Sequence, residues 1–252
     1  MIYIKTAQEI DGIRKSCQIS AEILKIIGDL IKPGITTKML DEFAEDYIKS
    51  KGAIPAFKGY SQAGSFNFPG SICASPDDVV VHGIPNDEPL REGQILSIDV
   101  GVLLNGYYGD AAYSYSVGKI GELKKKLIKV TQESLYKGIR NAIDGNRVKD
   151  ISEAVQTHVE SNGFSVVKEL TGHGVGKFLH EDPSIPNYVI PGNSPRLREG
   201  MTIAIEPMVN AGSWRVRTLS DGWTIVTEDG KPSAHFEHTV LITKNEPEIL
   251  TI

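Results

Sequence analysis

The chain has 252 residues, 40% of them hydrophobic, and a formal net charge of −5, a composition typical of a globular protein with a sizeable core. The acidic balance argues against non-specific nucleic-acid binding, and no apolar run approaches the roughly 18 residues of a membrane span. Because only Cys17 and Cys73 are present and the first residues lack the pattern of a signal peptide, we expect a cytoplasmic protein without a disulfide framework, a nucleic-acid partner or a membrane partner.

Two helices are predicted at the start of the chain. The segment from Thr6 to Glu9 has the pattern of a capping box, and apolar residues then recur at helical spacing until Pro33 and Gly34 end the run. A second helix is expected from about Thr37, with Gly52 as its C-terminal stop.

A β-hairpin is the clearest prediction between residues 95 and 117, because Asn105-Gly106 is a strong two-residue turn signal. If Leu104 pairs with Tyr107, the apolar residues of both strands share one face of the hairpin. Asp99 and Asp110 then fall on the other face as diagonal neighbours. Two facing acids repel each other, so we expect a cation or a shared proton between them.

The second half of the chain offers similar elements. Helices are predicted from about residue 122 to 143 and from 150 to 161, ending before Gly145 and Gly163. Two strand-like runs follow, 201–208 with Glu206 and 235–243 with Glu237.

The tetrapeptide LREG occurs at 90–93 and again at 197–200, and each copy leads, six residues after its glycine, to an acid: Asp99 in the first and Glu206 in the second. Helical hairpins are common enough for chance similarity, but the doubled segment favours a duplicated helix-and-strand unit. We therefore predict one catalytic domain, residues 1–252, built of two pseudo-symmetric lobes at about 1–118 and 119–252.

Histidines near these acids lie in segments rich in glycine or proline, at His82, His173 and His180. A histidine taken alone is more often structural, which is our interpretation of His158 on its helix, while His235 and His238 beside Glu237 are left open. Four carboxylates and one imidazole can bind two divalent ions if two of the acids bridge, with manganese, iron, cobalt or zinc favoured by such ligands. Paired ions of this kind activate water for hydrolysis of an acyl bond.

The order and surroundings of these residues resemble the metal-ligand pattern of type I methionine aminopeptidases. The matching segments are VHGIP at 81–85, LSIDVG at 96–101, GHGVG at 172–176, IAIEPM at 203–208 and the run from 221 to 240. The resemblance covers essentially the whole chain. It implies the α+β pita-bread fold, in which two αβ lobes surround a central curved antiparallel sheet.

The resemblance also implies an activity and a site. Enzymes of this family remove the initiator methionine from nascent proteins and peptides whose second residue is small. By analogy, Asp110 and Glu237 bridge two divalent ions (cobalt, manganese, iron, zinc or nickel), Asp99 holds one ion, and His173 with Glu206 holds the other. Glu206 is also implied as the proton shuttle for a metal-bridging hydroxide that attacks the first peptide bond.

Other expected site residues contact the substrate. His82 and His180 match the two active-site histidines that do not bind metal and that stabilise the tetrahedral oxyanion and the leaving nitrogen. Candidates for the methionine pocket are Tyr60, Phe68, Cys73 and Trp223, although core packing is as good an interpretation for Cys73 and Trp223. Leu179 occupies a position that is often aromatic in the family.

Two segments depart from the family pattern. Residues 61–65 look like a short insertion in the loop with Tyr60 and Phe68, and Ala111 stands where threonine is common, so a hydrogen bond behind the ligands is expected to be missing.

Two alternatives are kept open. One is another pita-bread peptidase, such as an X-Pro aminopeptidase or a prolidase-like enzyme, although the 98 residues ahead of Asp99 leave no room for the extra domain of those enzymes. The other is a non-catalytic binding module, although such modules typically lose ligands that this chain retains. We expect peptide or nascent-protein N-termini as partners, near the ribosome, and a monomer.

Overall fold

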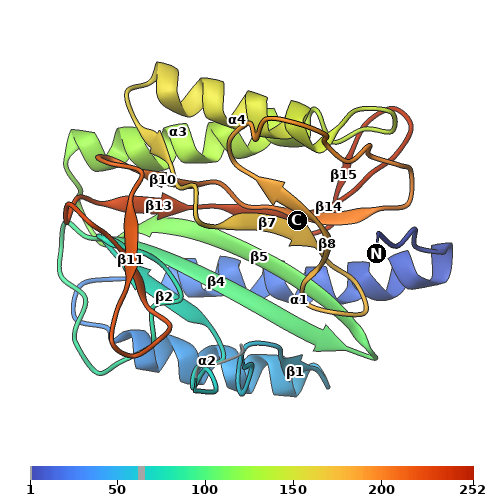
Figure 1. Cartoon of the computed structure of the whole chain (residues 1–252). Coiled ribbons are helices and arrows are strands. Elements are labelled where there is room, and N and C mark those ends of the chain that lie inside the picture. Colours follow the sequence, from blue (N-terminus) through green and yellow to red (C-terminus); the bar gives the residue numbers. More distant parts are fainter. Residues whose placement is uncertain (1, 62–65) are drawn as a thin grey trace.

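The computed structural model describes residues 2–61 and 66–252 (Figure 1). Its helices are α1 (Ala7–Leu30), α2 (Thr37–Ser50), α3 (Glu122–Ile139) and α4 (Val148–Ser161). Its strands are β1 (Ile54–Pro55), β2 (Cys73–Pro76), β3 (Val79–Val81), β4 (Ile95–Leu104), β5 (Tyr107–Ser116), β6 (Ser165–Val166), β7 (Thr171–Gly174), β8 (Glu181–Pro186), β9 (Thr202–Ile205), β10 (Met208–Asn210), β11 (Val216–Thr218), β12 (Ile225–Thr227), β13 (Ser233–His235), β14 (Glu237–Leu241) and β15 (Glu248–Ile249). Figure 1 shows α1 and α2 along one border of the strands and α3 and α4 along the opposite border.

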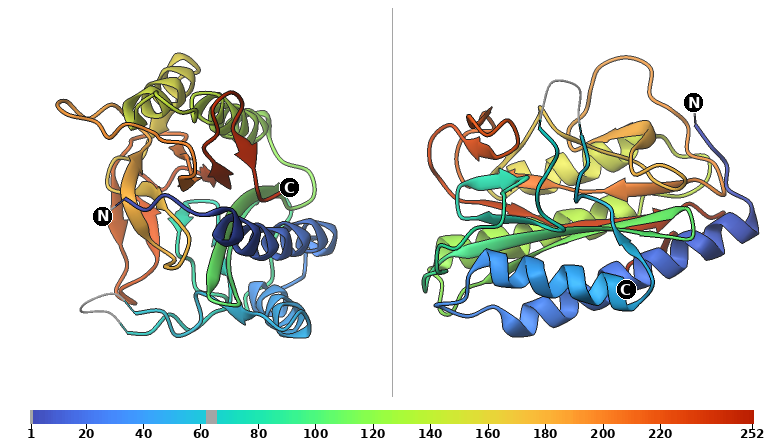
Figure 2. Two further views of the ribbon diagram at one scale, coloured as in Figure 1. Left: turned by 90° about the vertical axis from the view of Figure 1, so that its right-hand side faces the viewer. Right: turned by 90° about the horizontal axis from the view of Figure 1, so that it is seen from below.

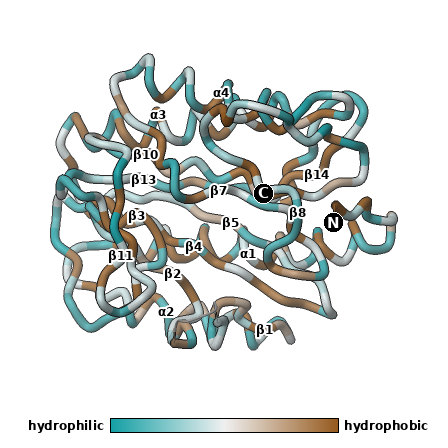
Figure 3. Tube along the Cα trace, viewed as in Figure 1, coloured by the Kyte–Doolittle hydropathy of each residue, from teal (hydrophilic) through white to brown (hydrophobic). Residues whose placement is uncertain are grey.

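Helix α1 begins as predicted. The Thr6 hydroxyl accepts the N–H of Glu9, and the Glu9 carboxylate accepts the N–H of Thr6, so the capping box is confirmed. Buried residues follow one stripe of the helix, among them Ile13, Ile23 and Ile27. This stripe contacts β4 and β5, and the brown segments in Figure 3 mark apolar residues on these strands.

The β4–β5 hairpin has the predicted register. Leu104 pairs with Tyr107, Asp99 with Ala112, and Gly101 with Asp110. Both acids therefore lie on one face, and the apolar residues of the other face pack against α1 and α2. The register is confirmed because the turn and the apolar alternation specify the same pairing.

Within residues 2–61 and 66–252, one sheet of nine strands joins both halves of the chain. Its order is β1-β4-β5-β14-β9-β7-β8, with β2 added to β4 and β15 to β14. The two halves meet where β5 pairs with β14, with Glu237 opposite Ala112. The views of Figure 2 show the curvature of this layer and the helices packed along it.

Several predicted boundaries are wrong. Helix α3 ends at Ile139, four residues early, where the Asn141 amide folds back and donates to the carbonyl of Lys137. Helix α4 begins at Val148, two residues early, because the Asp150 carboxylate accepts the N–H of Arg147 and caps the first turn.

Both predicted strands of the second half are interrupted at their acids. The run 201–208 divides into β9 and β10 around Glu206 and Pro207, and the run 235–243 divides into β13 and β14 at Phe236. Proline has no N–H to donate, so the ladder cannot continue through residue 207. The breaks leave Glu206 just beyond the end of β9 and Glu237 at the first position of β14.

Each helix pair packs its own core against the sheet. One core joins α1 and α2 to β4, and another joins α3 and α4 to β9 and β14. In the described part of the chain, no helix has both the length and the apolar character that a bilayer crossing requires.

Candidate metal centre

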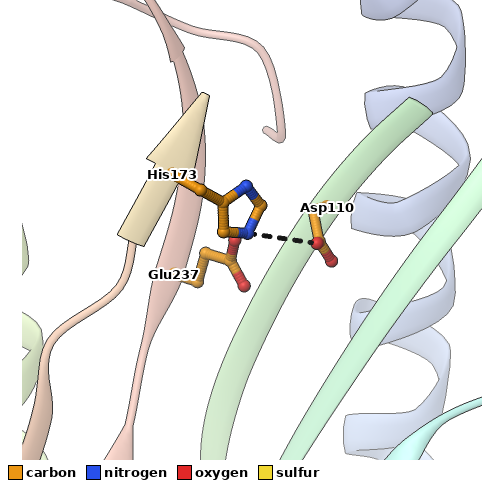
Figure 4. Close-up of side chains that lie close together, drawn as sticks. All are labelled: Asp110, His173 and Glu237. Atoms are coloured by element: carbon orange, nitrogen blue, oxygen red, sulfur yellow. Dashed lines mark ion pairs between the residues drawn. The ribbon is translucent and has the colours of Figure 1, made fainter. Parts of the chain in front are cut away.

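Three strands of the central sheet bring together Asp110, His173 and Glu237. One ligand atom from each residue lies within 4.8 Å of the others (Figure 4). Asp110 comes from β5, Glu237 from β14 and His173 from β7, so both halves of the chain contribute. The His173 Nε2 atom lies 3.9 Å from Asp110 Oδ2 and 3.5 Å from Glu206 Oε1.

The remaining two candidate ligands face the same space. Asp99, on β4, and Glu206, after β9, line one cavity of about 650 Å³ together with Asp110, His173 and Glu237. The same cavity is lined by the other predicted site residues, namely Tyr60, Phe68, Cys73, His82, His180 and Trp223.

The four candidate acid ligands form no ion pair with a lysine or arginine in the described part of the chain. No lysine or arginine is among the described residues that line it. Burial, followed by the nearby Asp110 carboxylate, raises the pKa of Asp99, Glu206 and Glu237 well above their ordinary values. Burial likewise raises the pKa of Asp110, to about 7.

The donor set fits divalent cations. Among the described residues, Asp99 Oδ1, Asp110 Oδ1 and Glu237 Oε1 are buried oxygens without a hydrogen-bond partner. A buried acceptor left unpaired costs about 1–3 kcal/mol, and more when it is charged. Oxygen ligands converging with one imidazole can offset that cost by binding divalent metal ions.

His173 has the form of a metal ligand. Its Nδ1 atom lies 2.8 Å from the Gly174 carbonyl oxygen, so Nδ1 carries the proton and Nε2 is left to face the acids. Burial, and then His180, lowers the pKa of His173 to about 3, which keeps the imidazole neutral and able to ligate.

His180 and His82 lie beside the acids. The His180 Nδ1 atom lies 2.8 Å from the Tyr60 hydroxyl. The His180 and His173 rings meet edge-on, with their centroids 4.4 Å apart. His82 has a backbone φ of 56°, in the left-handed region, and its ring contacts that of Trp223. Burial lowers the pKa of both histidines, that of His82 to about 4.

An apolar pocket borders the acids. Its buried members are Phe57, Phe68, Cys73, Leu179 and Trp223. The Trp223 indole N–H donates to the carbonyl of Phe66 at 2.6 Å, which satisfies its one polar group. Trp223 and Cys73 thus pack in an apolar cluster and also line the cavity, so core packing and a place in the pocket are compatible for these two residues.

Sequence reasoning missed Phe57, for which no motif gives a signal, and left His235 open. His235 is buried and lines the cavity with its Nε2 atom 3.6 Å from Glu206 Oε2. Its position two residues before Glu237, at a break in the strand, was the available signal.

The two departures from the family pattern have different outcomes. Residues 62–65 of the expected insertion lie outside the described residues. Ala111 lies on the opposite face of β5, in the core with α1 and α2, while the backbone of Asp110 is held by the hydroxyl of Thr239.

Comparison with known proteins decides the family. A model described as metallopeptidase family M24 matches residues 11–244. The chain belongs to family M24. Its relatives in that family include the methionine aminopeptidase of Clostridium perfringens, 51% identical over 100% of this chain and 99% of the relative. Methionine aminopeptidase 1 of Bacillus subtilis is 54% identical with the same coverage.

A solved structure agrees with these relatives. The methionine aminopeptidase from Rickettsia prowazekii superimposes with a TM-score of 0.96 at 43% identity, covering 100% of both chains. The predictions of the methionine aminopeptidase family, the pita-bread fold of α+β class and a metal-dependent aminopeptidase are therefore confirmed.

Proposed function

We propose that this M24 enzyme removes the N-terminal methionine from peptides and nascent proteins whose second residue is small. One observation carries the proposal: four acids, of which Asp110 and Glu237 are buried, and His173 border an apolar pocket within a single cavity. Methionine aminopeptidase relatives of the same length, more than 50% identical, support the same substrate.

Two divalent ions are the proposed cofactors, with cobalt, manganese, iron, zinc or nickel as candidates. Asp110 and Glu237 would hold both ions, Asp99 one of them, and His173 with Glu206 the other. Bound there, the ions would supply an acidified water and polarise the carbonyl of the first peptide bond.

The chain's own residues bind and orient the substrate. The pocket of Phe57, Phe68, Cys73, Leu179 and Trp223 would take the thioether side chain, which suits soft and aromatic neighbours. The acids would attract the free amino group at the opening of this pocket, so only an N-terminal methionine can reach both.

Glu206 is the proposed proton shuttle. Its carboxylate faces the cavity, and it would accept a proton from the attacking water and pass it to the leaving nitrogen. His82 and His180 border the same space and would donate hydrogen bonds to the carbonyl oxygen as it becomes negative.

We further propose that the enzyme works in the cytoplasm as a monomer, on chains emerging from the ribosome. The two cysteines are buried and free, as expected in a reducing compartment.

The test uses metal-stripped protein and the peptide Met-Ala-Ser, with manganese, iron, cobalt or zinc added in turn. We expect metal to restore methionine release, and Glu206→Gln to lower kcat by at least about 100-fold through loss of the proton shuttle. Glu228→Gln, which neutralises an exposed acid, is the matched control and should retain activity. Peptides that begin with leucine should not be cleaved, and selective cleavage of an X-Pro peptide would overturn the proposal.

A further inference from the structure

The loop that carries His180 folds around the carboxylate of the next residue. This loop, residues 175–180, joins β7 to β8. Glu181 Oε1 accepts the N–H of Lys177 at 2.8 Å and that of Phe178 at 3.1 Å. The carboxylate therefore determines the path of the loop immediately before His180.

The other oxygen of this carboxylate is paired with a residue from the start of the chain. Lys5 Nζ donates to Glu181 Oε2 at 2.7 Å, and the side chains of Lys5 and Glu181 are only 6% and 2% exposed. Lys5 itself is fixed, because its backbone N–H donates to the Gly200 carbonyl at 2.8 Å. Ile2 forms a bridge with Asp182, and Figure 1 shows the N-terminal end beside β8.

Gly176 packs closely on both members of the pair. A Cβ atom placed on Gly176 would lie 2.8 Å from Lys5 Cε and 2.9 Å from Glu181 Oε1. Close packing on both partners means that the position of the ammonium group is transmitted to the carboxylate and from there to the loop.

We propose that the buried Lys5–Glu181 pair is a positioning element that holds His180 against the substrate site. Neither residue belongs to the ligand cluster, and both act through the loop. The proposal rests on the function proposed above, in which His180 contacts the substrate. Misplacing such a group by about 1 Å can cost on the order of 100-fold in rate.

The test compares Lys5→Met with a matched control on the same loop. Lys177→Met removes the Lys177–Glu9 pair, which also connects the N-terminal segment to this loop, but Lys177 is 62% exposed. Exposed pairs contribute little, so this control should match the wild type. The double variant Lys5→Met/Glu181→Gln leaves no unpaired buried charge and keeps an acceptor for both loop N–H groups, so it can be studied if Lys5→Met fails to fold.

Three quantities are measured. In Lys5→Met and in the double variant, kcat should fall about 10- to 100-fold, while KM for Met-Ala-Ser and the Kd for manganese should stay within about twofold. In the metal-free protein, the imidazole resonance of His180, assigned with His180→Gln, should shift or broaden in both variants and remain unchanged in Lys177→Met.

An unchanged His180 resonance and unchanged kcat in the double variant would overturn the proposal, as would an equal effect of Lys177→Met. If the wild type releases no methionine with any metal, the function proposed above has failed. The His180 resonance of the metal-free variants still decides the positioning role in that case.

Discussion

At the scale of single residues, Glu237 shows what the site demands of the fold. Its carboxylate is buried, and its Oε1 atom has no hydrogen-bond partner among the described residues. An unpaired buried acid is costly in the absence of metal and favourable once a cation is bound. As a proposed metal ligand, the residue would support metal binding and oppose the stability of the metal-free protein.

The variant Glu237→Gln separates these two effects because it removes the charge and keeps the shape. In the presence of a metal chelator, we expect the free energy of unfolding of this variant to exceed that of the wild type by on the order of 1 kcal/mol. Its affinity for manganese should fall at least about 10-fold, because even the mutation of a residue that only hydrogen-bonds to a metal ligand lowers metal affinity by that much. Urea denaturation and calorimetric titration measure the two quantities. Glu228→Gln should change neither, and a less stable metal-free Glu237→Gln would contradict the interpretation.

At the scale of elements, α1 lies directly on the β4–β5 hairpin. A close backbone approach is at Gly109 on β5, where an added Cβ would lie 2.4 Å from the backbone nitrogen of Cys17. Backbone cannot move aside as the end of a flexible side chain can. The contact also determines the distance between α1 and β5, the strand that carries Asp110.

Gly109→Ala should therefore force α1 away from the hairpin. We expect a loss of about 1–3 kcal/mol of stability, measured by urea denaturation, because the added methyl overpacks a full core. Ser116→Ala on the same strand is the control: Ser116 is exposed, and its change should stay within about 0.5 kcal/mol. Equal stability of the two variants would show that the helix can shift freely.

The elements also show where prediction from sequence succeeds. The start of α1 and the hairpin register were correct because local rules decide them: a capping box within four residues, and a two-residue turn that specifies every pair. The end of α3 follows from the local contact of Asn141 with Lys137, which apolar periodicity does not reveal, and the break at Phe236 depends on contacts made far along the chain. One such contact is the N–H of Phe236, which donates to the carbonyl of Pro207 across the gap.

The same distinction between local rules and distant contacts applies to the site. The hairpin register alone places Asp99 beside Asp110, whereas the approach of β7 and β14 to that pair follows from the order of the sheet. The full ligand set was reached through family resemblance. Phe57 escaped notice because a single phenylalanine carries no periodic signal. The division into two related lobes and the roles of the site residues stay predictions.

At the scale of the whole molecule, one sheet crosses both halves, so the candidate ligands belong to a single body. Strands β5 and β14 are hydrogen-bonded neighbours, and acids from each face the same cavity. Opening either half would separate the ligands and release bound metal. Metal binding should therefore stabilise the entire fold and not only one part of it.

This coupling predicts a single unfolding transition that moves with metal concentration. At free manganese of 100 times Kd, the stability should rise by about 2.7 kcal/mol per independent site. Tryptophan fluorescence reports on Trp214 and on Trp223 beside the cavity, and circular dichroism reports on all helices, so both should give one midpoint with and without metal. Separate midpoints for the two signals would show that the halves unfold independently.

The turn at Asn105-Gly106 connects these scales. It is exposed, and surface turns usually tolerate insertions well. Here every pair of β4 and β5 is counted from that turn, so one added residue would shift the pairing and send Asp110 to the face that packs on α1. Two residues at the tip of a hairpin therefore hold the geometry of the candidate metal centre.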